Sequence, residues 1–457
     1  MPEKSALHKL LIDAAERGVA YRESGVDRRV SPSPEAVAAA KGFVERMPDE
    51  GTSDDRVLAM LDEIGSPATV MMTGPRYFGF VIGGSLPVTV ATNWLATAWD
   101  QNVGMHEVTP ATSTLERVAM DWMIDLFGLP PATAASFVTG ATIANFTALA
   151  AARNRVYADI GWNVEADGLI GAPPVTVIVS EETHPTVFKS LGLLGFGRNR
   201  VVRAPVDAQG RIDAKRFPAI NGPTIVCTQA GNVNTGAFDP VGSICDIAKP
   251  EGAWVHVDGA FGLWAAASPD RMHLCSGFSA ADSWATDAHK WLNVPYDSGV
   301  AFVRDGLALK SAMAITAEYL MTETRFRNPS DFTPELSRRA RGVDVWAALK
   351  SLGRQGVAAM IDRCCNHARR FAVGLREAGF EVLNDVVLNQ VLVSFGDDAS
   401  NRKIIDAVQQ DGTCWCGVTV WQGKTAMRIS VCNWSTTERD VDLSLDAIVR
   451  IARAHQP

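Results

Sequence analysis

The segment SWATDAHKW occupies residues 283–291 and runs from a short apolar stretch into a lysine, Lys290. We predict that SWAT forms a strand and that Lys290 follows its end, flanked by His289 and Trp291. One interpretation is a lysine whose stem lies along apolar surface and whose amine is ion-paired. The other is a partly desolvated amine that forms an imine with an aldehyde, for which a strand end in an α/β sheet is a suitable place.

Similar short apolar runs on both sides of this segment predict further strands. They are SFVT (136–139), VTVIVS (175–180), TIVCTQ (224–229), WVHVD (254–258) and GVAFV (299–303). Helical stretches such as IANFTALAAARNRVYADIG separate most of them, and this alternation favours an α/β fold with a mainly parallel sheet and helices on both faces. Ligands of such sheets bind at the carboxyl ends of the strands, so functional residues are expected directly after the strands.

Asp258 ends the predicted strand WVHVD and is followed by the small residues Gly259 and Ala260. A carboxylate at a buried strand end is costly unless it pairs with a cation. A pyridinium nitrogen would be such a cation, and Ala260 leaves room for a flat ring against the backbone. The alternative is an aspartate that caps a helix.

Two further strand ends carry residues suited to other parts of a cofactor. After SFVT, the segment from Thr139 to Thr142 enters a helix whose first N–H groups could bind phosphate, although Thr142 could equally cap that helix. After VTVIVS, His184 could stack on an aromatic ring or be an ordinary core or loop histidine. Each feature is ambiguous alone, but together they meet four needs of one cofactor at one edge of a sheet.

These motifs, in this order, resemble the group II pyridoxal 5'-phosphate (PLP)-dependent amino-acid decarboxylases from about Tyr77 through Gly353. HVDGAF resembles the family's HVDAA(Y/F), and DAHKW resembles its NPHKW or DPHK. The resemblance implies fold type I of the PLP-dependent transferases, with PLP held as a Schiff base on Lys290 and no metal. It further implies Asp258 at the pyridine nitrogen, Ala260 against the ring, His184 stacked on the ring, Ala141 and Thr142 at the phosphate, and Asp287 and His289 beside the lysine.

Three longer segments also resemble family blocks: TPATSTLERVAMDWMIDLFGLP (109–130), GAFDP (236–240) and ELSRRARGVDVWAALKSLG (335–353). In the family, the segment around Leu336-Ser337 reaches the partner subunit's phosphate. The resemblance therefore implies a homodimer with shared active sites, in which Ser337 lies near the partner's cofactor and the N-terminal helices wrap over the partner.

The chain departs from the family pattern at several places. Relatives carry Gly-Thr-Thr before GAFDP where this chain has Gly231-Asn232-Val233, and Ala288 replaces the usual proline. The segments 74–84 and 99–108, expected to line the substrate pocket, depart as well. The substrate of the known relatives is therefore not carried over.

The activity implied by the resemblance is α-decarboxylation of an L-amino acid to the amine and CO2. The glycine and aromatic residues of segment 76–80 favour an aromatic or medium-sized apolar substrate over a dicarboxylic one. The alternatives are a PLP-dependent aldehyde synthase, an aminotransferase or carbon–carbon lyase on the same fold, and a non-catalytic PLP-binding protein.

Tyr319 bears on the choice between decarboxylase and aldehyde synthase. It lies in AEYLMTE, as far beyond Lys290 as the catalytic-loop tyrosine of aromatic-amino-acid decarboxylases, within a polar stretch typical of a lid. A phenol there can give a proton to Cα once CO2 has left, whereas relatives with Phe at this place tend to make aldehydes. The alternative is a tyrosine that only anchors the loop by packing.

The composition argues against several other classes. The chain has 457 residues and a formal net charge of -8, without a basic run, so we expect no nucleic-acid or membrane partner. It starts with a charged amphipathic segment and contains no apolar stretch that could span a bilayer, which favours a cytoplasmic protein. Its eight cysteines lack the spacing of a zinc site and are interpreted as idle thiols.

The chain is predicted to fall into three parts. Residues 1–76 form a helical arm interrupted by Ser-Pro-Ser-Pro at 31–34, residues 77–345 form a large PLP-binding domain, and residues 346–457 form a small α/β domain. The small domain is expected to contain an antiparallel sheet built from VLVSF (391–395), GVTVWQ (417–422) and AMRISVC (426–432).

Overall fold

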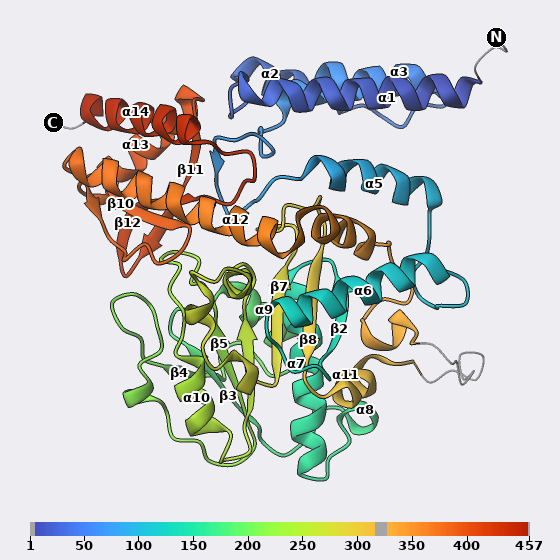
Figure 1. Ribbon diagram of the computed structural model, residues 1–457, viewed down its shortest axis with the longest axis vertical. Helices are drawn as coiled ribbons and strands as arrows, with labels where there is room; N and C mark the ends of the chain where they lie inside the picture. The colour runs from blue at the N-terminus through green and yellow to red at the C-terminus, as the bar shows by residue number, and fades with distance from the viewer. Residues whose placement is uncertain (1–4, 316–326, 456–457) are drawn as a thin grey trace. The chain divides into compact units, whose positions relative to one another are not determined.

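The computed structural model describes residues 5–315 and 327–455 (Figure 1). The chain forms two compact units: a large unit of Gly83–Ala368 with Asn384–Gln390, and a small unit of Met1–Ile82, Arg369–Leu383 and Val391–Pro457. The two units are groups of residues in mutual contact, and they do not test the predicted division into three parts at 76/77 and 345/346. That division stays a prediction.

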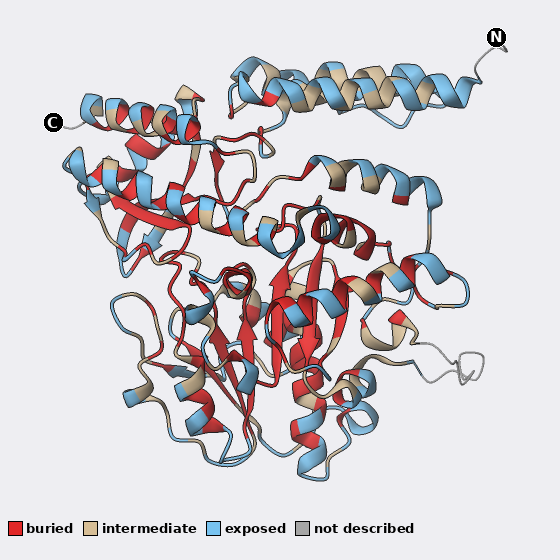
Figure 2. Ribbon diagram, viewed as in Figure 1, coloured by how far each residue is buried: buried red, intermediate tan, exposed pale blue. Residues whose placement is uncertain are grey.

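A seven-stranded sheet forms the core of the large unit. Its strands, in spatial order, are β2 (Ala134–Val138), β8 (Gly299–Val303), β7 (Ser283–Asp287), β6 (Trp254–Asp258), β5 (Thr224–Gln229), β3 (Thr176–Ser180) and β4 (Val202–Ala204). β8 runs antiparallel to both of its neighbours and every other pairing is parallel, which confirms the predicted mainly parallel sheet. Figure 2 shows that its central strands are buried, as expected for a sheet covered on both faces.

Helices cover both faces of this sheet, also as predicted. On one face, α7 (Ala141–Asp159), α9 (Pro185–Leu193) and α11 (Gly306–Met313) share a hydrophobic cluster with β3 and β5. On the opposite face, Phe302 of β8 packs against Phe127, which directly follows α6 (Pro110–Leu126), and α10 (Val241–Ala248) contacts β6. The right-handed crossovers of parallel strands produce this arrangement.

The other helices of the large unit lie in its connections. They are α5 (Pro87–Trp99), α8 (Val164–Asp167) and the short helices η4 (Ala214–Arg216), η5 (Gly262–Ala267), η6 (Met272–Cys275), η7 (Phe278–Ala280) and η9 (Pro329–Phe332). α12 (Gly342–Glu377) leads out of the large unit and is interrupted at Gly353, whose φ of 61° is non-helical.

The small unit contains a five-stranded sheet. In spatial order its strands are β1 (Tyr77–Phe78), β11 (Trp415–Trp421), β12 (Lys424–Ser430), β10 (Gln390–Ser394) and β9 (Glu381–Val382). The pair β11–β12 is antiparallel as predicted. The sequence did not predict β9, which is antiparallel to β10, or β1, a two-residue strand parallel to β11.

Helices of both chain ends complete the small unit. They are α1 (Ala6–Glu23), η1 (Ser24–Val26), α2 (Pro34–Ala39), η2 (Ala40–Phe43), α3 (Asp54–Met60), η3 (Leu61–Gly65), α4 (Ser66–Ala68), α13 (Asp398–Asp411) and α14 (Glu438–His455). Across the described residues, no helix combines the length and the apolarity needed to cross a membrane.

Candidate active site

A cavity of about 380 Å³ lies at the carboxyl edge of the large unit's sheet. Its walls come from the ends of β5, β6 and β7 and from the residues that directly follow β2 and β3. This is where ligands bind in open α/β sheets. The predicted site residues that line it are Ala141, Thr142, His184, Asp258, Ala260, Asp287, His289 and Lys290.

Asp258 places a buried carboxylate against this cavity. Its Oδ2 accepts a hydrogen bond from Asn145 Nδ2 at 3.0 Å, and its Oδ1 accepts one from the backbone N–H of Ala260 at 3.2 Å. Burial raises the pKa of Asp258, while the charges of His184 and Lys290 and the two hydrogen bonds oppose that rise. Asp258 does not cap the next helix, η5, whose N-cap is Phe261. A buried carboxylate open to a cavity is suited to pairing with a cation there.

Lys290 lies three residues beyond β7 and lines the same cavity. Lys290 Nζ is 3.0 Å from Asp287 Oδ2, so the lysine is ion-paired, as the first interpretation of the sequence expects. It also stands at a strand end, where the second interpretation places an imine-forming lysine. The backbone here is tightly packed, because a Cβ atom on Gly83 would lie 1.7 Å from the carbonyl oxygen of Lys290. The peptide that carries Lys290 therefore rests directly on Gly83.

Asp287 connects three parts of the site. Besides pairing with Lys290, it accepts the backbone N–H of Ala141 at 2.5 Å, and its Oδ1 lies 3.5 Å from His289 Nε2. A carboxylate at the first N–H of α7 is also favoured by the helix dipole. Asp287 occupies the N–H of Ala141, and the N–H of Ala144 donates to the Gly140 carbonyl. The backbone donors that α7 offers to an anion are therefore the N–H groups of Thr142 and Ile143.

His184 is held in one orientation beside the cavity. It is the N-cap residue of α9, and its Nδ1 accepts the N–H of Thr186 at 3.4 Å and lies 2.8 Å from Thr186 Oγ1. Its own backbone N–H donates to Gln229 Oε1 at 3.2 Å. An imidazole that is neutral and accepts at Nδ1 carries its proton on Nε2.

His289 is likewise fixed next to Lys290. Its Nδ1 accepts the backbone N–H of Ser298 at 3.0 Å, and its ring stacks on Tyr296 with the centroids 4.2 Å apart. Burial lowers the pKa of His289, which favours the neutral ring.

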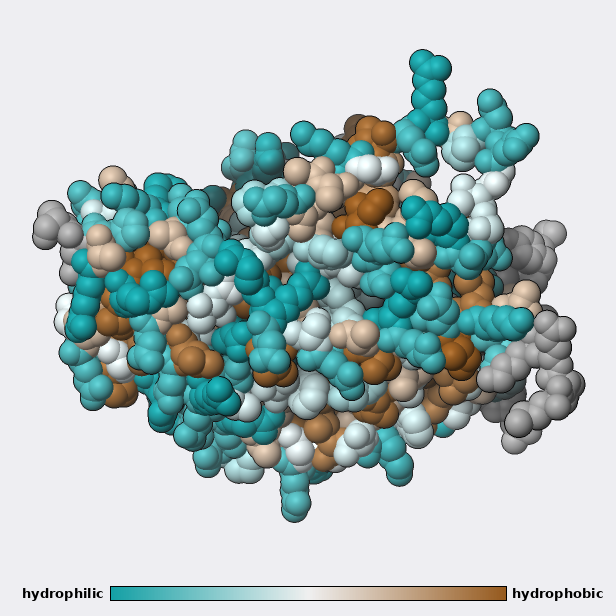
Figure 3. All heavy atoms as spheres, turned by 90° about the horizontal axis from the view of Figure 1, so that it is seen from above, coloured by the Kyte–Doolittle hydropathy of each residue, from teal (hydrophilic) through white to brown (hydrophobic). Residues whose placement is uncertain are grey.

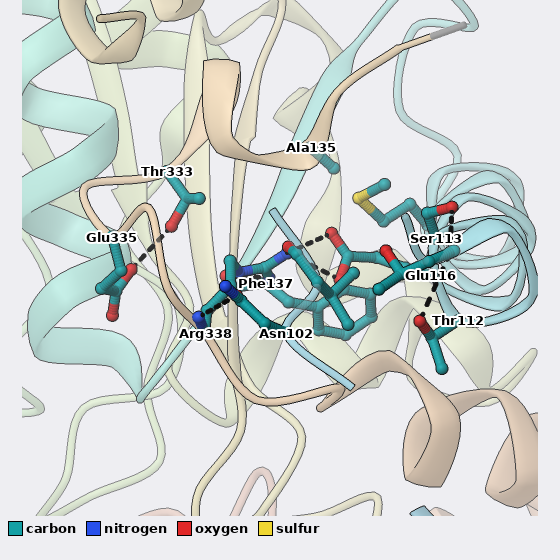
Figure 4. A network of polar contacts seen from close by, with 12 residues as sticks. Asn102, Thr112, Ser113, Glu116, Ala135, Phe137, Thr333, Glu335 and Arg338 are labelled. Carbon is teal, nitrogen blue, oxygen red and sulfur yellow. Dashed lines mark hydrogen bonds and ion pairs between the residues drawn. The ribbon is translucent and has the colours of Figure 1, made fainter. Parts of the chain in front are cut away.

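Ser337 does not line the cavity of its own chain and lies exposed at the surface. The next residue, Arg338, is anchored in the interior, where Nη1 donates to both oxygens of Glu116 at 2.9 Å and Nη2 donates to the Phe137 carbonyl at 2.7 Å (Figure 4). Asn102 accepts the N–H of Arg338 at 2.9 Å and lies 3.4 Å from Ser337 Oγ. The buried ion pair between Arg338 and Glu116 thus fixes the backbone directly after Ser337, whose own side chain faces outward. Tyr319 lies outside the described residues.

A family model described as the pyridoxal-dependent decarboxylase conserved domain matches residues 39–396 of the chain. The chain belongs to this family. It is 26% identical over 428 residues to the aromatic-L-amino-acid decarboxylase of Bacillus atrophaeus, covering 87% of this chain and 85% of that protein. It is 29% identical over 437 residues to the L-2,4-diaminobutyrate decarboxylase of Rhizobium meliloti, covering 90% and 84%.

The fold of this pyridoxal-dependent decarboxylase is also seen in solved structures. The crystal structure of Oryza sativa TDC with PLP and tryptamine superposes with a TM-score of 0.90 at 23% identity, covering 99% of each chain, and this likeness shows the fold alone. The family confirms the predicted PLP cofactor and amino-acid decarboxylase activity. The aldehyde synthase, aminotransferase and carbon–carbon lyase alternatives are not favoured.

The described residues fit the cofactor of the decarboxylase family. Asp258 offers a buried carboxylate to a protonated ring nitrogen, Lys290 offers an amine in the same cavity, and the start of α7 offers N–H donors to a phosphate. A volume of about 380 Å³ lies within the range of small-molecule sites.

Several lining residues of the decarboxylase cavity were not predicted from the sequence. They are Ile143, Thr186, Gln229, Val233, Phe261 and Tyr296. Asn145, which holds Asp258, was also missed, although its place one helical turn after Ala141 puts both residues on the same face of α7. The departure at 231–233 also has a structural meaning, because Asn232 Oδ1 accepts two backbone N–H groups of the following turn while Val233 lines the cavity.

Proposed function

We propose that the cavity at the sheet edge is the catalytic site and that its substrate is an aromatic or medium-sized apolar L-amino acid, which is converted to the amine and CO2. The observation that carries this proposal is that Asp258, Lys290 and His184 line one cavity, although they stand at the ends of three different strands, β6, β7 and β3. Such convergence of a carboxylate, an amine and an imidazole at a strand edge is typical of a built active site.

Each residue has one task in this proposal. When bound, PLP supplies an aldehyde that condenses with amines and a ring that draws electrons from the bond to be broken. Lys290 holds the cofactor between turnovers and gives way to the substrate amine, and Asp258 keeps a proton on the ring nitrogen. His184 packs against the ring and Ala260 leaves space for it. The N–H groups of Thr142 and Ile143 hold the phosphate.

The cavity walls support an apolar substrate side chain. Ile143, Val233 and Phe261 contribute apolar surface to the lining. Among the described residues of the lining, none is an arginine that would recognise a dicarboxylic substrate.

The test is to incubate the holoenzyme with each standard L-amino acid and with L-2,4-diaminobutyrate, measuring CO2, amine, aldehyde and peroxide. We expect the highest kcat/KM with an aromatic or medium-sized apolar amino acid. Fastest turnover of glutamate, aspartate or diaminobutyrate would contradict the substrate class, and absence of CO2 from every compound would contradict the function.

Tyr319 is proposed as the proton donor to Cα. We expect Tyr319→Phe to lower amine formation by roughly 10²–10⁴-fold, because the phenol is the general acid, and to shift the product toward aldehyde and peroxide. The matched control is Tyr157→Phe on α7, a tyrosine outside the cavity lining, which should leave both products unchanged. An unaltered amine rate and product ratio in Tyr319→Phe would remove this residue from the mechanism.

The active enzyme is proposed to be a homodimer with shared sites. α1 buries none of its side chains within the described chain, and Leu7 and Leu11 on it are 66% and 58% exposed. Trp94 and Trp99 on α5 are also exposed, and Figure 3 shows apolar residues among polar ones on the molecular surface. Apolar side chains exposed on several helices favour contact with another chain, and a second copy would meet the outward-facing Ser337.

A subunit-complementation experiment tests the shared site. Lys290→Ala and Ser337→Glu should each inactivate a homodimer, the second because its carboxylate repels the partner's phosphate. Co-expression should restore activity at roughly a quarter of the sites, since half of the randomly paired dimers are hybrids with one intact site each. Full activity in a sample shown by sedimentation to be monomeric, or hybrids that remain inactive, would refute the proposal.

A cytoplasmic location is also proposed. Burial raises the pKa of Cys227 to about 12, so this thiol stays protonated at neutral pH, as suits a thiol kept reduced. Cell fractionation with a tagged chain tests this, and recovery outside the cytoplasm would contradict it.

A further inference from the structure

A line of buried hydrogen bonds runs behind Asp258, and we call it the Asp258 relay. Its members are Trp254, Ser283, His256, Asn145 and Asp258, all buried. In order, Trp254 Nε1 is 2.9 Å from Ser283 Oγ, Ser283 Oγ is 2.9 Å from His256 Nδ1, His256 Nε2 is 2.8 Å from Asn145 Oδ1, and Asn145 Nδ2 is 3.0 Å from Asp258 Oδ2. The relay therefore links an indole at the start of β6 to the carboxylate at its end.

The geometry of the sheet brings these residues together. Trp254, His256 and Asp258 are alternate residues of β6, so their side chains share one face. The register between β6 and β7 places Ser283 opposite His256, and α7 contacts this pair of strands and supplies Asn145.

The donors and acceptors along the relay have one direction. The Trp254 indole can only donate, so it uses a lone pair of Ser283 Oγ and leaves the Ser283 hydroxyl proton to donate to His256 Nδ1. Burial lowers the pKa of His256 to about 3, so its ring is neutral and carries its single proton on Nε2. That proton is donated to Asn145 Oδ1, which turns the NH2 group of Asn145 toward Asp258.

The reversed arrangement is inferior. With the proton on His256 Nδ1, Asn145 would have to turn its NH2 group toward His256 and its carbonyl toward Asp258. Because a carbonyl and a carboxylate are both acceptors, Asp258 would then have to be protonated to make this hydrogen bond. The Ser283 hydroxyl would accept two protons, and its own proton would have no acceptor among the described contacts. The direction of the relay is thus coupled to the ionisation of Asp258.

We propose that His256 is a positioning residue that, through Asn145, holds Asp258 as an ionised acceptor facing the ring nitrogen of the cofactor. This inference rests on the proposed role of Asp258 and extends it to residues that do not line the cavity. The other titratable groups that act on Asp258 are His184 and Lys290, and Cys227 lies near it on β5. These groups stay in place when the relay is cut, so the relay can be tested separately.

The first test measures the tautomer of His256 by ¹⁵N NMR of the histidine-labelled holoenzyme. We expect a neutral ring with the proton on Nε2, which a histidine that merely fills space need not adopt. A proton on Nδ1, or an imidazolium at neutral pH, would overturn the inference. This measurement needs no variant, so it decides the matter even if substitutions at His256 prevent folding.

The second test measures the protonation of the ring nitrogen in ¹⁵N-labelled PLP, together with the Kd of the cofactor. We expect His256→Leu to decrease ring protonation and to weaken cofactor binding by about tenfold, as fits loss of a hydrogen bond supporting a charged group. His256→Gln, which keeps an N–H donor for Asn145, should recover part of both. The matched control is His367→Leu, the loss of another buried imidazole, on α12, which should leave both unchanged.

Asp258→Asn separates this inference from the proposed function. If Asp258→Asn leaves the ring nitrogen protonated, the role of Asp258 itself is wrong. If Asp258→Asn removes the ring proton but His256→Leu does not, the proposed function stands and the relay is refuted. Loss of the ring proton in both variants, with His367→Leu unaffected, is the expected result.

Discussion

Replacing Lys290 with alanine should lower decarboxylation by at least about a thousandfold and remove the covalent attachment of the cofactor. Lys290 lines the cavity, and the structure holds it there through the ion pair with Asp287 and the packing of its backbone on Gly83. Borohydride reduction of the wild type, followed by peptide mass spectrometry, should place the cofactor on Lys290. Release of CO2 from the best substrate measures the rate.

Two further variants separate the functions of this side chain. Lys290→Arg keeps a cation beside Asp287 but offers no amine for attachment, so it should be as inactive as Lys290→Ala while retaining more of the fold stability. Lys310→Ala removes another ion-paired lysine, whose Nζ lies 3.2 Å from Asp331 Oδ2, and should retain full activity. A fully active Lys290→Ala enzyme with the cofactor trapped on a different lysine would show the assignment to be wrong.

Replacing Asp258 with alanine should lower the rate by roughly 10²–10³-fold, the range found when one preorganised electrostatic partner is lost. The Kd of the cofactor should rise because the ring nitrogen loses its counter-ion, and Asp258→Glu should retain some activity. A wild-type rate in Asp258→Ala would exclude this role.

The stability of the cofactor-free protein should depend on pH through Asp258. Burial raises the pKa of Asp258 in the folded chain above its unfolded value, so ionising this group costs stability as the pH rises through that interval. The Tm of the apoprotein should therefore fall as the pH rises through that interval, and the Tm of Asp258→Ala, which has no group to ionise there, should fall less. The same pH dependence of Tm in wild type and Asp258→Ala would contradict this. Asp344→Asn, at a carboxyl whose pKa burial also raises but which lies outside the cavity, should alter Tm without altering activity.

The strand ends could be predicted because strands buried on both faces consist of continuous apolar runs. β6 and β8 match the predicted WVHVD and GVAFV residue for residue, and Asp258 stands at the predicted end of β6. β4 was missed because it has only three residues, of which Val202 is 39% exposed. Such a short strand shows neither a continuous apolar run nor an alternation of apolar and polar residues.

The contacts behind the cavity could not be predicted from the sequence pattern. Asn145 and Ser283 lie 111 and 27 residues from His256, and they meet it only because the register of β6 and β7 and the position of α7 bring them to one face. Register is a property of the assembled sheet and is not encoded in any single run. Ser337 was identified from the family resemblance alone. Its proposed place beside the partner's phosphate depends on contact with a second chain, which a pattern within one chain does not indicate.

Gly83 has no side chain and no chemical role, yet it limits how this enzyme can evolve. Even the methyl group of alanine at position 83 would collide with the peptide of Lys290, more than two hundred residues away in the chain. In a survey of variants, this position would therefore rank with the reactive lysine, although alanine alters neither charge nor polarity.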